Sequence, residues 1–427
     1  MHQKILLKNG TLLYPHGAMK KEDLMIENGK IREIDNSLSV YSGIHEIDVT
    51  GGLLLPGMID PHVHFREPGF LEKEGIDNGS KAAIKGGVTT VFDMPNTNPP
   101  CDNLQAFEEK RSLFQEKSFV NWGLHYMASP TMGMLPEKAL SAKIYMARSS
   151  SQSAWNDFNS LKTIFQKSPC VTIHGEDEKY FIHNPCHSHR RPRKAIQEAL
   201  KTIKDVLINL SEDERPRVIL CHASTVDDVS WLKEMKAKGF DVWGETAPHY
   251  LWFTADDEEK YGAKYQVNPP LRNSQDREAL RQAVKEGILD FIGTDHAPHT
   301  PAEKASSNPP SGIPGIEWAM PAILELAEQQ IIPWSRIIPL IYSKSCQCYK
   351  LSGYSGLNSG GWANVVVLKK TKKFSDTLVT KAGYNPYEHL RLTYSVDKVF
   401  VNGNLVYDEG QFKNLEKGKE IVRAFSD

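Results

Sequence analysis

The sequence predicts a protein of the α/β class: a parallel (β/α)8 barrel of the TIM type with a small β-sandwich domain formed by the N- and C-terminal segments. Eight apolar, strand-like runs alternate with helical segments through the middle of the chain. Short strand-like runs joined by hairpin signals stand at both ends. Because neither end alone has enough strands for a stable core, we expect the two ends to pair with each other.

The terminal runs share one pattern, in which an Asn-Gly pair separates two apolar runs. These pairs are Asn28-Gly29 and Asn402-Gly403, and Asn-Gly is the strongest short hairpin signal. The expected strands are residues 5–7, 12–13, 23–26 and 30–34 at one end, and 364–368, 398–401 and 405–407 at the other. We therefore predict a small β-domain made of residues 1–53 and 351–427, with the barrel at residues 54–350.

The eight central runs have the length and apolar character of buried parallel strands. They are residues 57–65, 88–94, 120–126, 142–146, 170–174, 217–222, 241–245 and 289–295. Helical spacing with few breakers marks intervening segments such as residues 77–85, 194–210 and 274–285. The apolar run 53–56 is predicted to be a buried strand that leads into the functional site.

Composition restricts the classes of function. The chain has 427 residues, 40% hydrophobic and 24% charged, and a formal net charge of -2 gives nucleic-acid binding no electrostatic support. No apolar run has the length of a membrane span and the first residues do not form a signal peptide, so a cytoplasmic protein is expected. The six cysteines are interpreted as structural or incidental. Cys346 and Cys348 lack a second pair that would complete a zinc site.

Polar residues follow several of the predicted strands. His62 and His64 are two residues apart, so both imidazoles point to one face of an extended strand and suit a metal such as zinc. In a parallel barrel the carboxyl ends of the strands meet at one face. The other polar residues expected at that face are Asn96, Lys143, His174, His222, Asn268 (on a loop) and Asp295.

Each of these residues also has a structural interpretation. A single histidine at a strand end is usually a hydrogen-bonded structural residue, Asp295 is able to cap a turn, and Arg66 is able to form a surface ion pair. Lys143 stands among apolar neighbours, where an unpaired charge is costly. Carbamylation resolves that cost, because a neutral amine captures carbon dioxide and becomes an anionic ligand. The coincidence of all of them at corresponding strand ends favours a functional site.

Five motifs resemble those of dihydroorotases of the amidohydrolase superfamily, in the long, class I form. They are residues 57–69 (GMIDPHVHFREPG), 94–97 (MPNT), 267–272 (VNPPLR), 293–299 (GTDHAPH) and 312–317 (GIPGIE). The resemblance covers essentially the whole chain, including both β-like ends.

The resemblance implies two zinc ions per chain. His62, His64 and Asp295 would hold the more buried ion, and His174 and His222 the other. A carbamylated Lys143 and a hydroxide would bridge them. Some class I members use an aspartate bridge instead, but here a lysine stands on the fourth run, as in the carbamylated members.

The resemblance also implies a substrate and a reaction. Arg66 and Asn96 match positions that hold the substrate carboxylate, and Asn268 and His299 match positions that contact the ring or carboxylate. The implied reaction is the reversible hydrolysis of (S)-dihydroorotate to N-carbamoyl-L-aspartate in pyrimidine (UMP) synthesis. Hydroxide attacks the ring amide carbonyl, and Asp295 accepts a proton and returns it to the leaving nitrogen. A homodimer is implied by the resemblance alone.

Two rival interpretations remain at this stage. Hydantoinases and allantoinases share the metal ligands, but Arg66, Asn96 and His299 favour a substrate with a carboxylate. A non-catalytic scaffold of the same fold is expected to have lost ligands, whereas every expected ligand is present here.

Two polar segments stand near the predicted site. Residues 300–314 follow the eighth run, and a mobile lid and a plain surface loop are equally compatible with their sequence. Residues 183–191 are rich in His and Arg. They are interpreted as a solvated loop, with recruitment of a metal or a partner as the alternative.

Overall fold

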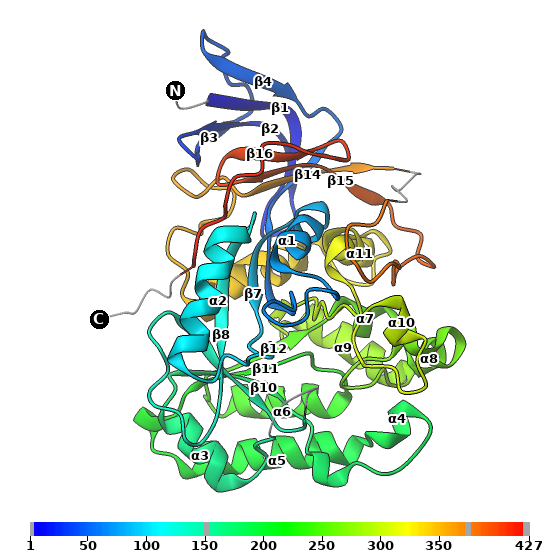
Figure 1. The fold of residues 1–427 in the computed structure, drawn as a ribbon. Helices are drawn as coiled ribbons and strands as arrows, with labels where there is room; N and C mark the ends of the chain where they lie inside the picture. The colour runs from blue at the N-terminus through cyan, green and yellow to red at the C-terminus, as the bar shows by residue number, and fades with distance from the viewer. Residues whose placement is uncertain (1–3, 149–153, 372–376, 422–427) are drawn as a thin grey trace.

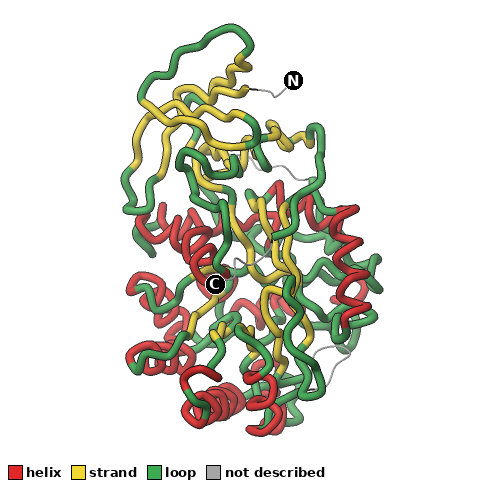
Figure 2. Tube along the Cα trace, turned by 90° about the vertical axis from the view of Figure 1, so that its left-hand side faces the viewer, coloured by secondary structure: helices red, strands yellow, loops and turns green. Residues whose placement is uncertain are grey.

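Two sheets account for the strands of this computed structural model, which describes residues 4–148, 154–371 and 377–421. The terminal β-domain lies at one end of the molecule and the barrel at the other (Figure 1). Helices surround the barrel strands, whereas the terminal domain is made of strands and loops (Figure 2). The predicted fold class is therefore confirmed.

The terminal domain is one nine-stranded sheet to which both ends of the chain contribute. Its order is β17-β16-β15-β14-β5-β1-β2-β3, with β4 paired to β1. Its strands are β1 (Lys4–Leu13), β2 (Met19–Glu27), β3 (Lys30–Asp35), β4 (Ile44–Asp48), β5 (Leu53–Pro56), β14 (Val365–Lys370), β15 (Tyr394–Val401), β16 (Asn404–Asp408) and β17 (Gln411–Phe412).

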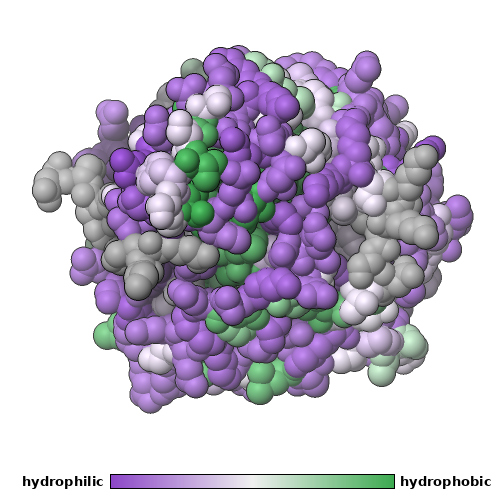
Figure 3. Space-filling view, turned by 90° about the horizontal axis from the view of Figure 1, so that it is seen from above, coloured by the Kyte–Doolittle hydropathy of each residue, from purple (hydrophilic) through white to green (hydrophobic). Residues whose placement is uncertain are grey.

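Apolar side chains from both ends of the chain form the core of this domain. Ile5 and Leu7 of β1 belong to the same buried cluster as Val365 and Val367 of β14 and Phe400 of β15. The outer face of this domain is mostly hydrophilic, with hydrophobic side chains in a narrow strip (Figure 3). The pairing of the two ends is thus maintained by a shared apolar core as well as by hydrogen bonds.

The barrel strands run in sequence order from β6 to β13. They are β6 (Met58–Val63), β7 (Val88–Asp93), β8 (Asn121–Met127), β9 (Ala139–Tyr145), β10 (Cys170–His174), β11 (Arg217–Leu220), β12 (Val242–Thr246) and β13 (Phe291–Ile292). The ring closes where Val63 bridges His296 and the His64 N–H donates to the His296 carbonyl at 2.9 Å. These closing contacts lie beside the histidines predicted to bind metal.

Twelve α-helices are found in the described residues. They are α1 (Ile76–Lys85), α2 (Leu104–Lys117), α3 (Phe158–Gln166), α4 (His187–Arg190), α5 (Arg193–Asn209), α6 (Val226–Ala237), α7 (Pro248–Trp252), α8 (Ala255–Tyr261), α9 (Ser274–Glu286), α10 (Pro301–Lys304), α11 (Ala319–Glu328) and α12 (Lys344–Tyr349). None of the helices in these residues is long and apolar enough to cross a lipid bilayer.

The run 53–56 is a buried strand that leads into β6, as predicted, but its place in the terminal sheet was not predicted. This strand, β5, pairs with β1 and β14 of the terminal sheet and does not belong to the barrel. Gly57 separates β5 from β6, the first barrel strand, and its N–H donates to the Asn364 carbonyl at 2.9 Å. The segment therefore joins the two sheets, while the division at residues 53/54 and 350/351 stays a prediction.

Candidate active site

The first group of candidate metal ligands lies where the barrel closes. His62 is on β6, His64 follows that strand, and Asp295 follows β13. Asp295 Oδ1 lies 3.4 Å from His62 Nε2 and 3.2 Å from His64 Nε2. One donor atom from each residue lies within 4.8 Å of the others, which is a spacing compatible with a shared metal ion.

Hydrogen bonds at the far nitrogens orient both imidazoles. His62 Nδ1 lies 2.6 Å from Glu245 Oε1, and His64 Nδ1 lies 2.7 Å from Asn96 Oδ1. A carboxylate or amide oxygen only accepts, so each Nδ1 is the protonated nitrogen. The lone pairs of both Nε2 atoms consequently face Asp295, as ligation of one cation requires.

A second pair of histidines lies beside the first group. His174 ends β10 and His222 follows β11, with His174 Nδ1 3.0 Å from His222 Nε2. The other nitrogen of His174 is 3.1 Å from Glu176 Oε2, so His174 Nδ1 is left to face the cavity. Ring centroids of His222 and His62 are 5.4 Å apart, which places the two groups next to each other.

Burial keeps these imidazoles in the neutral form that binds metals. It holds the pKa of both His62 and His222 well below the usual value. Burial alone would raise the pKa of Asp295, but His62, His64 and His222 hold it well below its usual range. Neutral imidazoles and an ionised carboxylate are the ligand forms that a zinc-type cation needs.

Lys143, on β9, is completely buried and lines the same cavity as both groups. Its Nζ lies 3.0 Å from Cys221 Sγ and 5.2 Å from the centre of the Tyr145 ring. Among the described residues it forms no ion pair with a carboxylate. A buried, unpaired ammonium is costly, so a neutral amine or a carbamate fits this position better.

The opposite side of the cavity is suited to an anion. Arg66 donates from Nε to the Pro298 carbonyl at 3.2 Å, and its Nη2 lies 3.1 Å from His299 Nε2. Burial and the neighbouring Arg66 hold the pKa of His299 far below its usual value, so His299 is neutral. Asn268 Oδ1 is buried and has no hydrogen-bond partner among the described residues.

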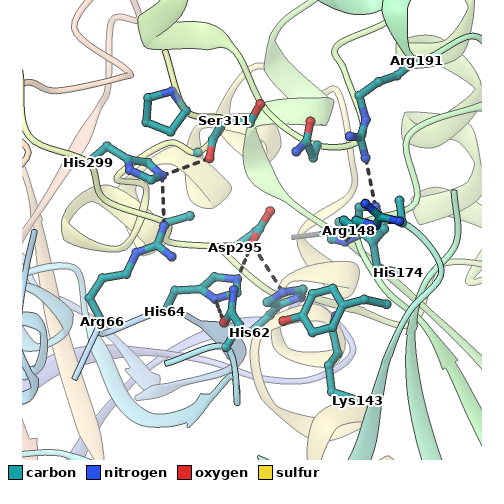
Figure 4. Close-up of a pocket in the computed structure, with 18 residues that line it drawn as sticks. His62, His64, Arg66, Lys143, Arg148, His174, Arg191, Asp295, His299 and Ser311 are labelled. Carbon is teal, nitrogen blue, oxygen red and sulfur yellow. Dashed lines mark hydrogen bonds and ion pairs between the residues drawn. The ribbon is translucent and has the colours of Figure 1, made fainter. Parts of the chain in front are cut away.

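All of the predicted site residues line one cavity of about 210 Å³ (Figure 4). These residues are His62, His64, Arg66, Asn96, Lys143, His174, His222, Asn268, Asp295 and His299. Three of them, Arg66, His222 and Asp295, have φ of 65°, 36° and 49°, a region that is unfavourable for residues with a side chain. Such strain is typical of functional sites, where the surrounding structure enforces it.

Residues that the sequence did not identify also belong to this site. Tyr145, Arg148, Arg191 and Ser311 line the cavity, and Glu176 and Glu245 support the histidines. Cys221 is buried, and its Sγ lies within 4.8 Å of ligand atoms of His62 and Glu245, so these three residues form a further group of possible metal ligands.

The solvated-loop prediction for residues 183–191 is wrong at His187 and Arg191, which are both buried. His187 Nε2 lies 2.9 Å from the Val267 carbonyl, and Arg191 pairs with Glu176. The other His and Arg side chains of this segment, at 183, 189 and 190, are exposed as expected. The segment therefore contributes to the cavity through two of its residues.

The segment 300–314 is not a plain surface loop, because Pro310, Ser311 and Gly312 line the cavity. It begins with the short helix α10. Its movement as a lid stays a hypothesis.

Comparison with known proteins identifies the class to which this fold and site belong. Residues 53–406 match the Amidohydrolase family. The chain belongs to that family, and hydrolysis of a cyclic amide is the class of reaction that its relatives support.

Within the family, the curated relatives with similar sequences are dihydroorotases. The chain is 32% identical to the dihydroorotase of Listeria welshimeri, over 96% of this chain and all of that protein. It is 34% identical to the dihydroorotase of Geobacillus thermodenitrificans, over 95% and 99% of the two chains.

Two solved structures with a similar fold are a dihydropyrimidinase and a hydantoinase rather than dihydroorotases. A dihydropyrimidinase from Brevibacillus agri has a TM-score of 0.85 and 25% identity, over 99% of both chains. An L-hydantoinase from Arthrobacter aurescens has a TM-score of 0.89 and 23% identity, over 99% of this chain and all of the other. The second likeness shows the fold alone.

Proposed function

We propose that this protein is a dihydroorotase that reversibly hydrolyses (S)-dihydroorotate to N-carbamoyl-L-aspartate in pyrimidine synthesis. The observation that supports this substrate is the buried guanidinium of Arg66, which lines the cavity on the side away from His174 and Lys143 (Figure 4). Dihydroorotate has a carboxylate on its ring, and a guanidinium is the side chain best matched to a carboxylate. The similarity to dihydroorotases supports the same choice.

Two divalent cations, proposed to be zinc, fit the donor set. His62, His64 and Asp295 would hold one of them, and His174 and His222 the other, with carbamylated Lys143 between them. Such ions lower the pKa of a water molecule and polarise the amide carbonyl under attack.

The residues of the chain perform the remaining steps. Asp295 accepts a proton from the attacking water and returns it to the ring nitrogen that leaves, which balances the reaction without another acid. Arg66 and Asn96 hold the carboxylate of the substrate. The unpaired oxygen of Asn268 is available to accept a hydrogen bond from a ring N–H, and neutral His299 contacts the ring or carboxylate.

A hydantoinase or dihydropyrimidinase is the second candidate, because solved structures of that kind match the whole fold. Their activity would need the same metal ligands. A ring without a carboxylate would leave the buried Arg66 without an anionic partner, which is costly. A cytoplasmic location remains a prediction from the sequence, and a homodimeric state remains a prediction from the resemblance.

The test is steady-state hydrolysis of dihydroorotate, hydantoin and dihydrouracil by the purified protein, before and after chelation. We expect dihydroorotate to be hydrolysed, activity to be lost on chelation, and zinc with bicarbonate to restore it. In Arg66→Ala, kcat/KM should fall about 10- to 100-fold, since a hydrogen bond to a charged group contributes about 1.5–3 kcal/mol.

The matched control is Arg32→Ala, which removes an exposed arginine of the terminal sheet. It should leave kcat/KM unchanged. Preferential turnover of hydantoin or dihydrouracil would refute the proposed substrate and retain the cyclic-amide class.

A further inference from the structure

The segment that follows α10 forms part of the substrate side of the cavity. Pro310, Ser311 and Gly312 line it, and the Ser311 carbonyl lies 3.1 Å from His299 Nε2 (Figure 4). His299 in turn contacts Arg66. The position of residues 310–312 therefore affects the groups proposed to contact the substrate.

Lys304, the last residue of α10, is buried beneath this segment with only 7% of its surface exposed. Its Nζ lies 3.0 Å from the Pro310 carbonyl, 2.9 Å from the Ala263 carbonyl and 3.4 Å from the Gln266 carbonyl. An ammonium has three N–H donors, so the number of donors matches the number of carbonyls. One side chain thereby joins the segment to the stretch of chain that leads to Asn268.

Direct hydrogen bonds join the same two stretches of backbone. The Gly312 N–H donates to the Gln266 carbonyl at 2.9 Å, and Gln266 Nε2 donates to the Pro309 carbonyl at 2.8 Å. A Cβ atom at Gly312 would approach the Ala297 carbonyl oxygen to 2.3 Å, which shows how closely the segment lies against the cavity. Few alternative positions of residues 309–312 are therefore compatible with these contacts.

Burying the ammonium group of a lysine at this position costs free energy that an apolar side chain filling the same space would not. Lys304 makes no ion pair among the described residues, and burial lowers its pKa to about 7. The neighbouring charge of Arg66 contributes to this lowering, while Glu258 and Glu303 act in the opposite direction. An apolar side chain of similar length would avoid the cost of burying a charge. What only the lysine supplies is a set of donors that hold three backbone carbonyls together.

We propose that Lys304 is a positioning residue for substrate binding. It fixes residues 305–312 against residues 263–266 and thereby sets the positions of the Ser311 carbonyl, His299 and Asn268. The predicted effect on substrate affinity rests on the proposed function, whereas the predicted effect on the position of residues 305–312 does not. It does not involve the metal ligands, so metal binding is expected to be independent of Lys304.

The experiment compares Lys304→Met with the wild type in the metal-loaded protein. Amide hydrogen exchange should become faster in residues 305–312, with the Gly312 amide among them. KM for dihydroorotate should rise about 10-fold or more, as expected for loss of hydrogen bonds to a charged donor. Metal content and kcat should stay within about 2-fold of the wild type.

Two further variants separate this role from a general loss of stability. Lys304→Gln keeps two of the N–H donors and should fall between wild type and Lys304→Met in both readouts. Lys264→Met removes an exposed lysine whose Nζ lies over the Tyr384 ring, two residues from Gln266, and should behave as wild type.

Unchanged exchange in residues 305–312, or faster exchange with an unchanged KM, would overturn the proposal. So would equal acceleration of exchange across the whole barrel. Hydrogen exchange does not depend on turnover. If the wild type fails to hydrolyse dihydroorotate, that result counts against the proposed function, while the exchange data still decide whether Lys304 fixes the segment.

Discussion

At the residue scale, Glu245 is the group that connects the two sets of candidate metal ligands. Its Oε1 accepts from His62 Nδ1 at 2.6 Å and from the backbone N–H of His222 at 3.1 Å. It therefore fixes the ring orientation of one ligand and the left-handed backbone of another. Gly293 makes room for it, since a Cβ there would approach the Glu245 carboxyl carbon to 2.9 Å.

Replacing Glu245 by alanine should weaken metal binding about 10- to 100-fold, because partners of metal-bound histidines typically contribute that much. Glu245→Gln should lose less, since its amide oxygen still accepts from His62 Nδ1. Competition with a chelator measures the affinity. The control is Glu325→Gln on α11, a buried glutamate that accepts from the Thr393 N–H and should alter only stability. Equal metal affinity in Glu245→Ala and the wild type would contradict this role.

A candidate site residue could be predicted from the sequence where its side chain suits metal binding and the predicted fold also determines its place. His62 and His64 share a face because of their spacing, and His174, His222 and Asp295 gather because parallel strands end at one face. Glu245 also ends a predicted strand, but a single glutamate at a strand end has no sequence pattern that distinguishes a functional role from a structural one. Arg191 lines the cavity because of the backbone conformation of residues 183–191, which is irregular apart from the short helix α4. Hydrophobic periodicity predicts helices and strands but not such a conformation, so this role could not be predicted.

At the element scale, a buried ion pair holds α2 against the end of β7. Lys110 of α2 pairs with Asp93, and its Nζ also donates to the Met94 carbonyl at 2.7 Å. Asp93 Oδ1 accepts from the Phe65 N–H at 2.7 Å. The pair thus connects the helix to two stretches of backbone, one beside His64 and the other close to Asn96.

Lys110→Met should lower the free energy of unfolding by about 3–5 kcal/mol, because it leaves Asp93 as a buried charge without its cation. The double variant Lys110→Met/Asp93→Asn should recover part of this loss, since asparagine carries no charge and still accepts from Phe65. Equilibrium unfolding in urea measures both values. A double variant less stable than Lys110→Met would show that the charge is not the cause.

Elements with a regular pattern were predicted within a few residues, as for α9 at Ser274–Glu286 against the expected 274–285. The eighth barrel strand is shorter than its apolar run, because only Phe291–Ile292 pairs with β12. The assignment of β5 to the terminal sheet was not predictable. A run buried on both faces has the same composition in either sheet, and its pairing depends on β14, more than 300 residues later.

At the scale of the whole molecule, the end of the described chain crosses back onto the barrel. The Trp122 N–H donates to the Lys419 carbonyl at 2.9 Å, and the Ile421 N–H donates to the Trp122 carbonyl at 2.7 Å. Arg111 of α2 pairs with both carboxylate oxygens of Glu420, at 2.6 and 2.7 Å. The chain thus leaves the terminal sheet and adds a short parallel segment beside the start of β8.

Truncation after Lys417 removes these four hydrogen bonds and should lower the free energy of unfolding by about 4 kcal/mol, at about 1 kcal/mol for each. It should leave metal affinity and kcat unchanged, because the contact is at Trp122, near the start of β8, whereas the cavity lies at the carboxyl ends of the strands. Truncation after Ile421 keeps every one of these contacts and is the matched control. Urea unfolding and chelator competition on both proteins separate the two effects. Loss of metal affinity in the shorter protein alone, with stability unchanged, would show that the C-terminal segment influences the site rather than the stability of the barrel.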